Sequence, residues 1–113
     1  MRHEIGVFLE DIQLAIVDIE SFVAGVNEGE FLTDAMRQAA VERKFIVVGE
    51  ALNQISRQLV GNEIGISRLR EIVDFRNRLV HGYRLVAPIR IYAVVKMDMP
   101  LLKKEVAALL LEY

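Results

Sequence analysis

The residues best suited to chemistry in this 113-residue chain lie in one segment, RNRLVHGY, at residues 76–83. A guanidinium can clamp two phosphate oxygens, and an imidazole can move protons because it titrates near neutral pH. If the ligand is RNA, these groups would support attack of a ribose 2′-hydroxyl on its own adjacent phosphate, which needs no external nucleophile. Arg76 and His81 are therefore the candidate catalytic residues.

Arg76 interrupts an apolar stripe. Leu69, Ile72, Arg76 and Leu79 follow one another at steps of three, four and three, which places the arginine on the apolar face of a predicted helix. A guanidinium cannot lose its proton there, so it needs an anionic partner or a cavity that is open to water. Two interpretations stay open at this point: an ion pair with an acid such as Glu50, or a phosphate site.

His81 follows Arg76 by five residues, which separates the two side chains by about 140° around an ideal helix. Gly82 comes next, and glycine commonly ends a helix, so we expect the last turn to unwind and swing His81 and Tyr83 toward Arg76. If each residue is considered by itself, a simpler explanation is available. A histidine at a helix C-terminus interacts favourably with the helix dipole, and a tyrosine such as Tyr83 commonly packs in the core or at its rim.

Other polar residues extend the candidate site. Asn77 would orient His81 or bind a phosphate oxygen, while Arg78 and Arg84 would guide RNA; each of these arginines, taken singly, is better explained as solvated surface charge. His3 and His81 are the only histidines, and no pair of acids has the spacing of a magnesium site. We expect neither a metal nor another cofactor.

Apolar periodicity predicts the elements that position these residues. Apolar side chains recur at steps of three and four over residues 2–25, 33–60, 67–80 and 88–113, and strand alternation is absent. Candidate N-caps are Thr33 or Asp34 for the second helix and Ser67 for the third. Residues 26–32 are expected to connect the first two helices, and Pro100 predicts a kink near residues 96–100. We therefore expect an all-α, up-and-down four-helix bundle with a kinked last helix.

The composition is that of one soluble domain over residues 1–113, with 53% apolar residues, 27% charged residues and no cysteine. No apolar run reaches the ~20 residues of a membrane span, so we expect a cytoplasmic protein without membrane contact. Residues 1–34 carry eight acids and one base, whereas residues 66–90 carry six arginines and two acids. This asymmetry favours a local contact with a polyanion at the arginine-rich segment.

Extra apolar residues on the second helix predict a homodimer. Ile46, Val47 and Val60 flank the apolar seam of that helix and broaden its apolar surface. A second copy of the chain would cover this surface. The alternative is a larger core with the second helix at its centre.

The chain also resembles a known family. The segment at 76–83 matches the RX4HXY motif of the HepT-like ribonuclease toxins, a branch of the HEPN superfamily. Gly49-Glu50-Ala51 is similar to the family's GEA segment, and residues 31–32 and 98–101 are similar to its sequences before the second helix and in the last helix. In order and spacing, the resemblance covers nearly the whole chain.

The resemblance implies a homodimer in which Arg76 and His81 of two subunits face each other across a cleft. Such a dimer is expected to cleave RNA without a metal and to leave a 2′,3′-cyclic phosphate. It also implies a toxin whose antitoxin, a minimal nucleotidyltransferase, transfers AMP from ATP to Tyr83. ATP would then be used by the partner and not by this chain.

Two other functions are compatible with the same residues. A non-catalytic helical dimer could use Arg76 and His81 to bind a nucleotide or a nucleotidyltransferase partner and regulate it. A purely structural bundle would use Arg76 only in an ion pair, and would tolerate leucine at that position.

Overall fold

The predicted apolar repeats form helices in the computed structural model, which describes residues 2–59, 64–82 and 86–113. Within these ranges every regular element is a helix, which confirms the all-α class. The helices are α1 (Arg2–Val23), α2 (Glu28–Leu32), α3 (Ala35–Gln58), α4 (Leu69–His81), α5 (Pro88–Met97) and α6 (Met99–Leu110).

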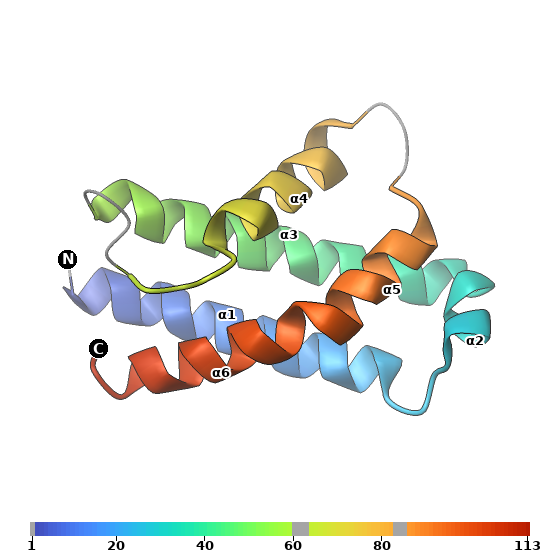
Figure 1. Cartoon of the computed structure of the whole chain (residues 1–113), viewed down its shortest axis with the longest axis horizontal. Coiled ribbons are helices and arrows are strands. Elements are labelled where there is room, and N and C mark those ends of the chain that lie inside the picture. Colours follow the sequence, from blue (N-terminus) through green and yellow to red (C-terminus); the bar gives the residue numbers. More distant parts are fainter. Residues whose placement is uncertain (1, 60–63, 83–85) are drawn as a thin grey trace.

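Helices α1 and α3 form the centre of the molecule, where they run antiparallel and side by side (Figure 1). Helix α6 packs along α1, and α4 packs on α3 at an angle. The molecule measures 42 × 30 × 18 Å, so it is about two helices thick. Within the described ranges, no helix combines the length and the apolar character needed to cross a bilayer.

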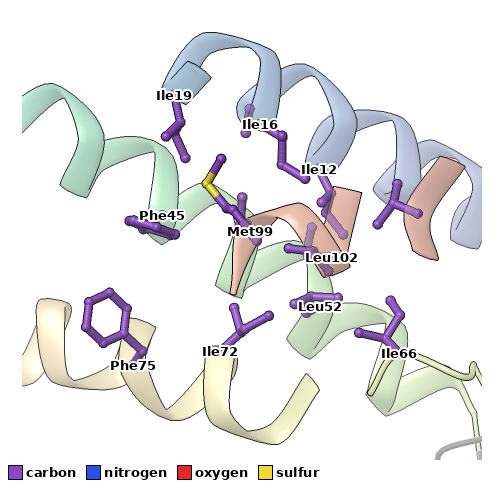
Figure 2. Packing of buried hydrophobic residues seen from close by; sticks show 14 of the residues in the cluster. Ile12, Ile16, Ile19, Phe45, Leu52, Ile66, Ile72, Phe75, Met99 and Leu102 are labelled. Carbon is purple, nitrogen blue, oxygen red and sulfur yellow. The ribbon is translucent and has the colours of Figure 1, made fainter. Parts of the chain in front are cut away.

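The core contains the apolar seam expected on the second helix. Figure 2 shows Phe45 and Leu52 of α3 among side chains from α1, α4 and α6. The rings of Phe45 and Phe75 meet edge to face with their centroids 5.5 Å apart, which joins α3 to α4. Each fully buried side chain of this size contributes about 1.5–3 kcal/mol to folding. The other buried seam residues of α3 are Val41, Val48 and Ile55.

Helix α2 was not predicted. Its first turn is closed by a capping box in which Asn27 accepts a hydrogen bond from the backbone of Glu30, and Glu30 accepts one from the backbone of Asn27. Phe31 of this helix is completely buried, with its ring centroid 5.4 Å from that of Tyr92 on α5. Residues 28–32 are therefore an anchored element and not a simple connection.

The expected kink in the last helix is present as a break. Helix α5 ends at Met97 and α6 begins at Met99, with Asp98 between them. Pro100 lies in the first turn of α6, where its missing N–H removes no helical hydrogen bond.

The start of α4 differs from the prediction, because Ser67 does not cap this helix. The Ser67 hydroxyl donates instead to Glu105 Oε2 of α6 at 2.5 Å, and its backbone N–H donates to Glu105 Oε1 at 3.1 Å. Ile64 and Ile66, on either side of Gly65 with its positive φ of 83°, are both buried. Packing of this turn against the core, and not a cap, sets where α4 begins.

Candidate functional site

The candidate site forms where α4 packs closely on α3 at Gly49. Gly49 of α3 lies directly against Arg76 of α4, and a Cβ atom at Gly49 would overlap the Cβ and Cγ atoms of Arg76. Atoms so close to the backbone cannot move aside without moving the helix. The absence of a side chain at Gly49 therefore allows the arginine stem to lie flat on α3.

The guanidinium of Arg76 is held by two acceptors. Its Nη2 atom donates to Oε1 of Glu50 in an ion pair, and its Nη1 atom donates to Oδ1 of Asn77 at 2.7 Å. The Arg76 side chain is 14% exposed and the Glu50 side chain is 51% exposed. The ion pair with Glu50, one of the two interpretations of Arg76 that the sequence left open, is thus present. Its carboxylate is nevertheless open to solvent.

The hydrogen bonds to Glu50 and Asn77 leave other N–H donors of the guanidinium without a described partner. Each terminal nitrogen carries two hydrogens, and one hydrogen on each is used by Glu50 or Asn77 among the described residues. The Nε atom is buried and has no described partner. Since buried polar atoms are nearly always hydrogen-bonded, Arg76 is not a fully satisfied structural arginine.

His81 is exposed at the last position of α4. The helix ends there as expected, but the predicted unwinding of its last turn is wrong. The Gly82 N–H still donates to the Arg78 carbonyl at 3.0 Å, which is the regular helical bond, and only then does the backbone become extended. His81 therefore keeps the angular offset of about 140° from Arg76 that a regular helix imposes.

Asn77 contacts one candidate catalytic residue, Arg76, and lies on the same side of α4 as the other, His81. It accepts the hydrogen bond from Arg76, and it lines a shallow depression together with Arg78, His81 and Gly82. Asn77 and His81 are four residues apart, so they share a face of α4. Its observed contact is with the arginine, whereas the sequence had indicated a role toward the histidine or a phosphate.

A second depression continues from Arg78 along the space between α4 and α5. Arg78 lines both depressions, and Arg68 and Arg90 join it in the second. Three acids also line this groove, and Arg68 is bridged to one of them, Asp98, at 3.3 Å. The formal charges of the three arginines and three acids in this lining therefore balance.

Three residues named in the sequence predictions, Tyr83, Arg84 and Val60, lie outside the described residues. Ile46 and Val47 are half-buried, and with Phe8 of α1 they line a groove that reaches Glu50.

Gly49 takes part in this geometry more directly than its sequence context indicated. It had been noted only as part of the GEA segment, whereas Glu50 was already a candidate ion-pair partner of Arg76. A glycine followed by an acid on the apolar face of a long helix is a usable signal, because it permits close helix approach and supplies a counter-charge at the same place. Within the described ranges, no group of three His, Asp or Glu side chains is arranged to hold a metal ion.

The fold and this site define a small helical protein with an arginine–histidine segment at the end of one helix. The model of the HepT-like family, described as "Ribonuclease HepT-like", matches residues 12–109. The chain belongs to the HepT-like ribonuclease family.

Curated relatives agree with this assignment. The chain is 35% identical to "Probable ribonuclease HepT" of Thermococcus cleftensis, over 85% of this chain and 86% of the relative. It is 30% identical to "Putative RNase MJ1380" of Methanocaldococcus jannaschii, over 93% of this chain and 95% of the relative. No solved structure matches the chain.

Proposed function

We propose that this protein is a metal-independent endoribonuclease in which Arg76 binds the scissile phosphate and His81 transfers protons. The observation that carries the proposal is the state of Arg76, whose side chain is largely buried, held by two acceptors and still able to donate from both terminal nitrogens. A planar donor with two adjacent N–H groups matches two oxygens of a phosphodiester. The family to which the chain belongs supplies RNA as the substrate class.

In the proposed reaction the ribose 2′-oxygen attacks the adjacent phosphorus, and the bond from phosphorus to the 5′-oxygen breaks. The proton of the 2′-hydroxyl leaves to a base, and a proton is delivered to the departing 5′-oxygen; the imidazole of His81 serves one of these steps. Negative charge that develops on the phosphate oxygens is stabilised by Arg76. The products are a 2′,3′-cyclic phosphate and a 5′-hydroxyl.

The site is proposed to be completed by a second copy of the chain. Because α4 remains helical through His81, Arg76 and His81 of one chain lie on different sides of that helix. A cleft between two copies would bring Arg76 of one protomer opposite His81 of its partner. The half-buried apolar side chains of Ile46 and Val47 on α3 are candidates for part of that interface.

The nuclease proposal is tested with purified protein, single-stranded RNA and EDTA. We expect the wild-type protein to cleave, to yield 2′,3′-cyclic phosphate ends, and to lose at least about 100-fold in rate in Arg76→Ala and in His81→Ala. RNA in which every 2′-hydroxyl is methylated should resist cleavage. An inert wild-type protein that still binds a nucleotide or a nucleotidyltransferase would instead support the regulatory dimer.

We further propose that the protein is a toxin neutralised by a nucleotidyltransferase that transfers AMP from ATP to Tyr83. Attack of the Tyr83 phenol oxygen on the α-phosphorus of ATP forms the new ester and releases pyrophosphate. Tyr83 follows His81 by two residues, so the added phosphate would bring negative charge to the arginine-rich segment. That charge would compete with an RNA phosphate for the arginines.

Co-expression with a nucleotidyltransferase encoded by a neighbouring gene tests the modification. We expect intact-protein mass spectrometry to show added AMP that maps to Tyr83 and is absent in Tyr83→Phe. The modified protein should no longer cleave RNA. Unmodified protein from cells that remain protected by the partner would contradict this proposal.

A further inference from the structure

We infer that Glu50 is a positioning residue for the proposed nuclease: its carboxylate holds the guanidinium of Arg76 in the orientation that receives the phosphate. This inference rests on the proposed function for its catalytic consequence. The contact itself is a hydrogen-bonded ion pair between Glu50 Oε1 on α3 and Arg76 Nη2 on α4. The two residues are 26 positions apart in the sequence, so only the packing of the helices brings them together.

Arg76 is restrained at its stem and at both terminal nitrogens. Its stem is fitted against α3 at Gly49, where even a methyl group would overlap it. At its far end, Glu50 holds one terminal nitrogen and Asn77 holds the other. An arginine side chain is otherwise flexible, so these contacts select one orientation of the guanidinium plane. Preorganised donors of this kind stabilise developing charge without having to reorient during the reaction.

The Glu50 carboxylate lies where it can orient the Arg76 guanidinium without blocking the binding of a phosphate. Glu50 uses a single N–H of Nη2, and one N–H on each terminal nitrogen remains for a phosphate among the described contacts. The Glu50 side chain is half exposed, so water screens its repulsion of an approaching anion. The contact with Arg76 is a direct hydrogen bond as well as a charge attraction, so its direction still orients the guanidinium.

Other ion pairs between helices provide the comparison. Asp18 of α1 pairs with Lys44 of α3 at 3.0 Å, and Glu20 of α1 pairs with Lys103 of α6 at 2.8 Å. In both pairs the cation is a lysine that is more exposed than Arg76. Asp18→Ala is therefore a matched control, because it removes one acid of an interhelical pair outside the candidate site.

The kinetic test compares Glu50→Ala, Glu50→Gln and Asp18→Ala on one RNA substrate. We expect Glu50→Ala to lower kcat by about 10- to 100-fold, because a misplaced catalytic group costs rate, while KM changes much less. Glu50→Gln should recover part of kcat, since its amide oxygen can still accept from Nη2. Asp18→Ala should keep the wild-type kcat. A wild-type or higher kcat in Glu50→Ala would overturn the inference.

Nitrogen NMR of the Arg76 guanidinium gives a readout that does not depend on cleavage. In the wild-type protein and in Asp18→Ala, rotation of the terminal nitrogens should be slow, and in Glu50→Ala it should become fast. If the wild-type protein cleaves no RNA but Glu50→Ala releases the guanidinium, the nuclease proposal fails and the positioning role stands. Unchanged rotation in Glu50→Ala would overturn the positioning role. If Glu50→Ala does not fold, Glu50→Gln carries both measurements, with faster rotation and reduced kcat expected.

Discussion

Arg76 combines two properties that rarely occur together, a largely buried side chain and incomplete hydrogen bonding. Its Nε atom is buried without a described partner, although Glu50 and Asn77 hold the terminal nitrogens. A residue selected only for stability could be replaced here by an apolar side chain, because a buried ion pair seldom contributes more than good apolar packing. The proposed phosphate contact explains why an arginine is present.

Replacing Arg76 by lysine tests whether its shape matters beyond its charge. A lysine ammonium is a point charge and cannot bind Glu50, Asn77 and a phosphate in one plane. We expect Arg76→Lys to lower kcat/KM by at least about 100-fold. The control is Arg70→Lys, an exposed position on the same helix, which should stay within about 2-fold of the wild-type value.

Arg76→Leu separates a catalytic arginine from a structural one. We expect this variant to lose RNA cleavage while its thermal unfolding midpoint stays equal or rises, because leucine suits the apolar stripe. Circular dichroism and the cleavage assay measure the two properties. Cleavage at the wild-type rate in Arg76→Leu would support the purely structural bundle.

At the scale of elements, the crossing of α3 and α4 depends on one glycine. Gly49→Ala would overlap the stem of Arg76, so α4 must shift. We expect this substitution to lower the free energy of unfolding by about 1–3 kcal/mol and to reduce cleavage.

Gly6→Ala is the matched control, since Gly6 is also a buried helical glycine. The nearest atom to its new methyl group is a backbone oxygen of Tyr113 at 3.5 Å, an ordinary contact. Alanine favours a helix over glycine by about 1 kcal/mol, so Gly6→Ala should be neutral or stabilising. Urea unfolding of both variants measures the difference, and equal effects would contradict the close approach at Gly49.

The N-terminus of α3 makes stability depend on pH. Asp34 caps this helix, and the hydrogen bond from the Arg37 backbone N–H lowers the pKa of its carboxyl. A lowered folded-state pKa means that the stabilisation is present above the unfolded pKa and is lost as pH falls through the folded value. Asp34→Asn should therefore be less stable than the wild-type protein near neutral pH, and the difference should shrink as the pH falls below the ordinary Asp pKa of about 3.9.

The pKa shift of Glu42, also on α3, has the opposite sign, and so does its effect on the pH dependence of stability. Burial raises the pKa of its carboxyl, so its contribution is fully present below the unfolded pKa and is lost as pH rises through the folded value. We expect Glu42→Gln to be more stable than the wild-type protein near neutral pH and to lose that advantage in acid. Thermal melts of both variants and the wild-type protein, from acid to neutral pH, check these two predictions. If the stabilities of both variants differ from wild type in the same direction at each pH, the predictions are contradicted.

At the scale of the whole molecule, the geometry of α4 argues for a site shared between two copies. Helical geometry separates Arg76 and His81 of one chain, and no unwinding at Gly82 corrects this. In the proposed dimer, mixing Arg76→Ala with His81→Ala would create heterodimers in which one intact Arg76 faces one intact His81. We expect such mixtures to regain cleavage that neither variant has alone.

The control for this mixture is the double variant Arg76→Ala/His81→Ala mixed with either single variant, which leaves no complete pair. Sedimentation or light scattering verifies that dimers form and exchange. If heterodimers form but RNA cleavage is not recovered, Arg76 and His81 act within one chain.

Local patterns determined much of this structure from the sequence alone. Steps of three and four place the apolar residues of α1, α3, α4 and the last helical segment, because a helix turns once in about 3.6 residues. The break near Pro100 and the cap at Asp34 were predictable for the same local reason. The position of Arg76 in an apolar stripe also follows from periodicity. Helix α2 is too short for periodicity to reveal it, and its asparagine and glycine resemble a loop.

Tertiary structure alone decided what the site residues contact. The pairing of Arg76 with Glu50 depends on where α4 crosses α3, and that crossing depends on the packing of Gly49 and of Phe45 against Phe75. The start of α4 depends likewise on the burial of Ile64 and Ile66 and on contact with α6. Periodicity describes one helix at a time, whereas these contacts join residues far apart in the chain, so their geometry is determined only when the helices pack together.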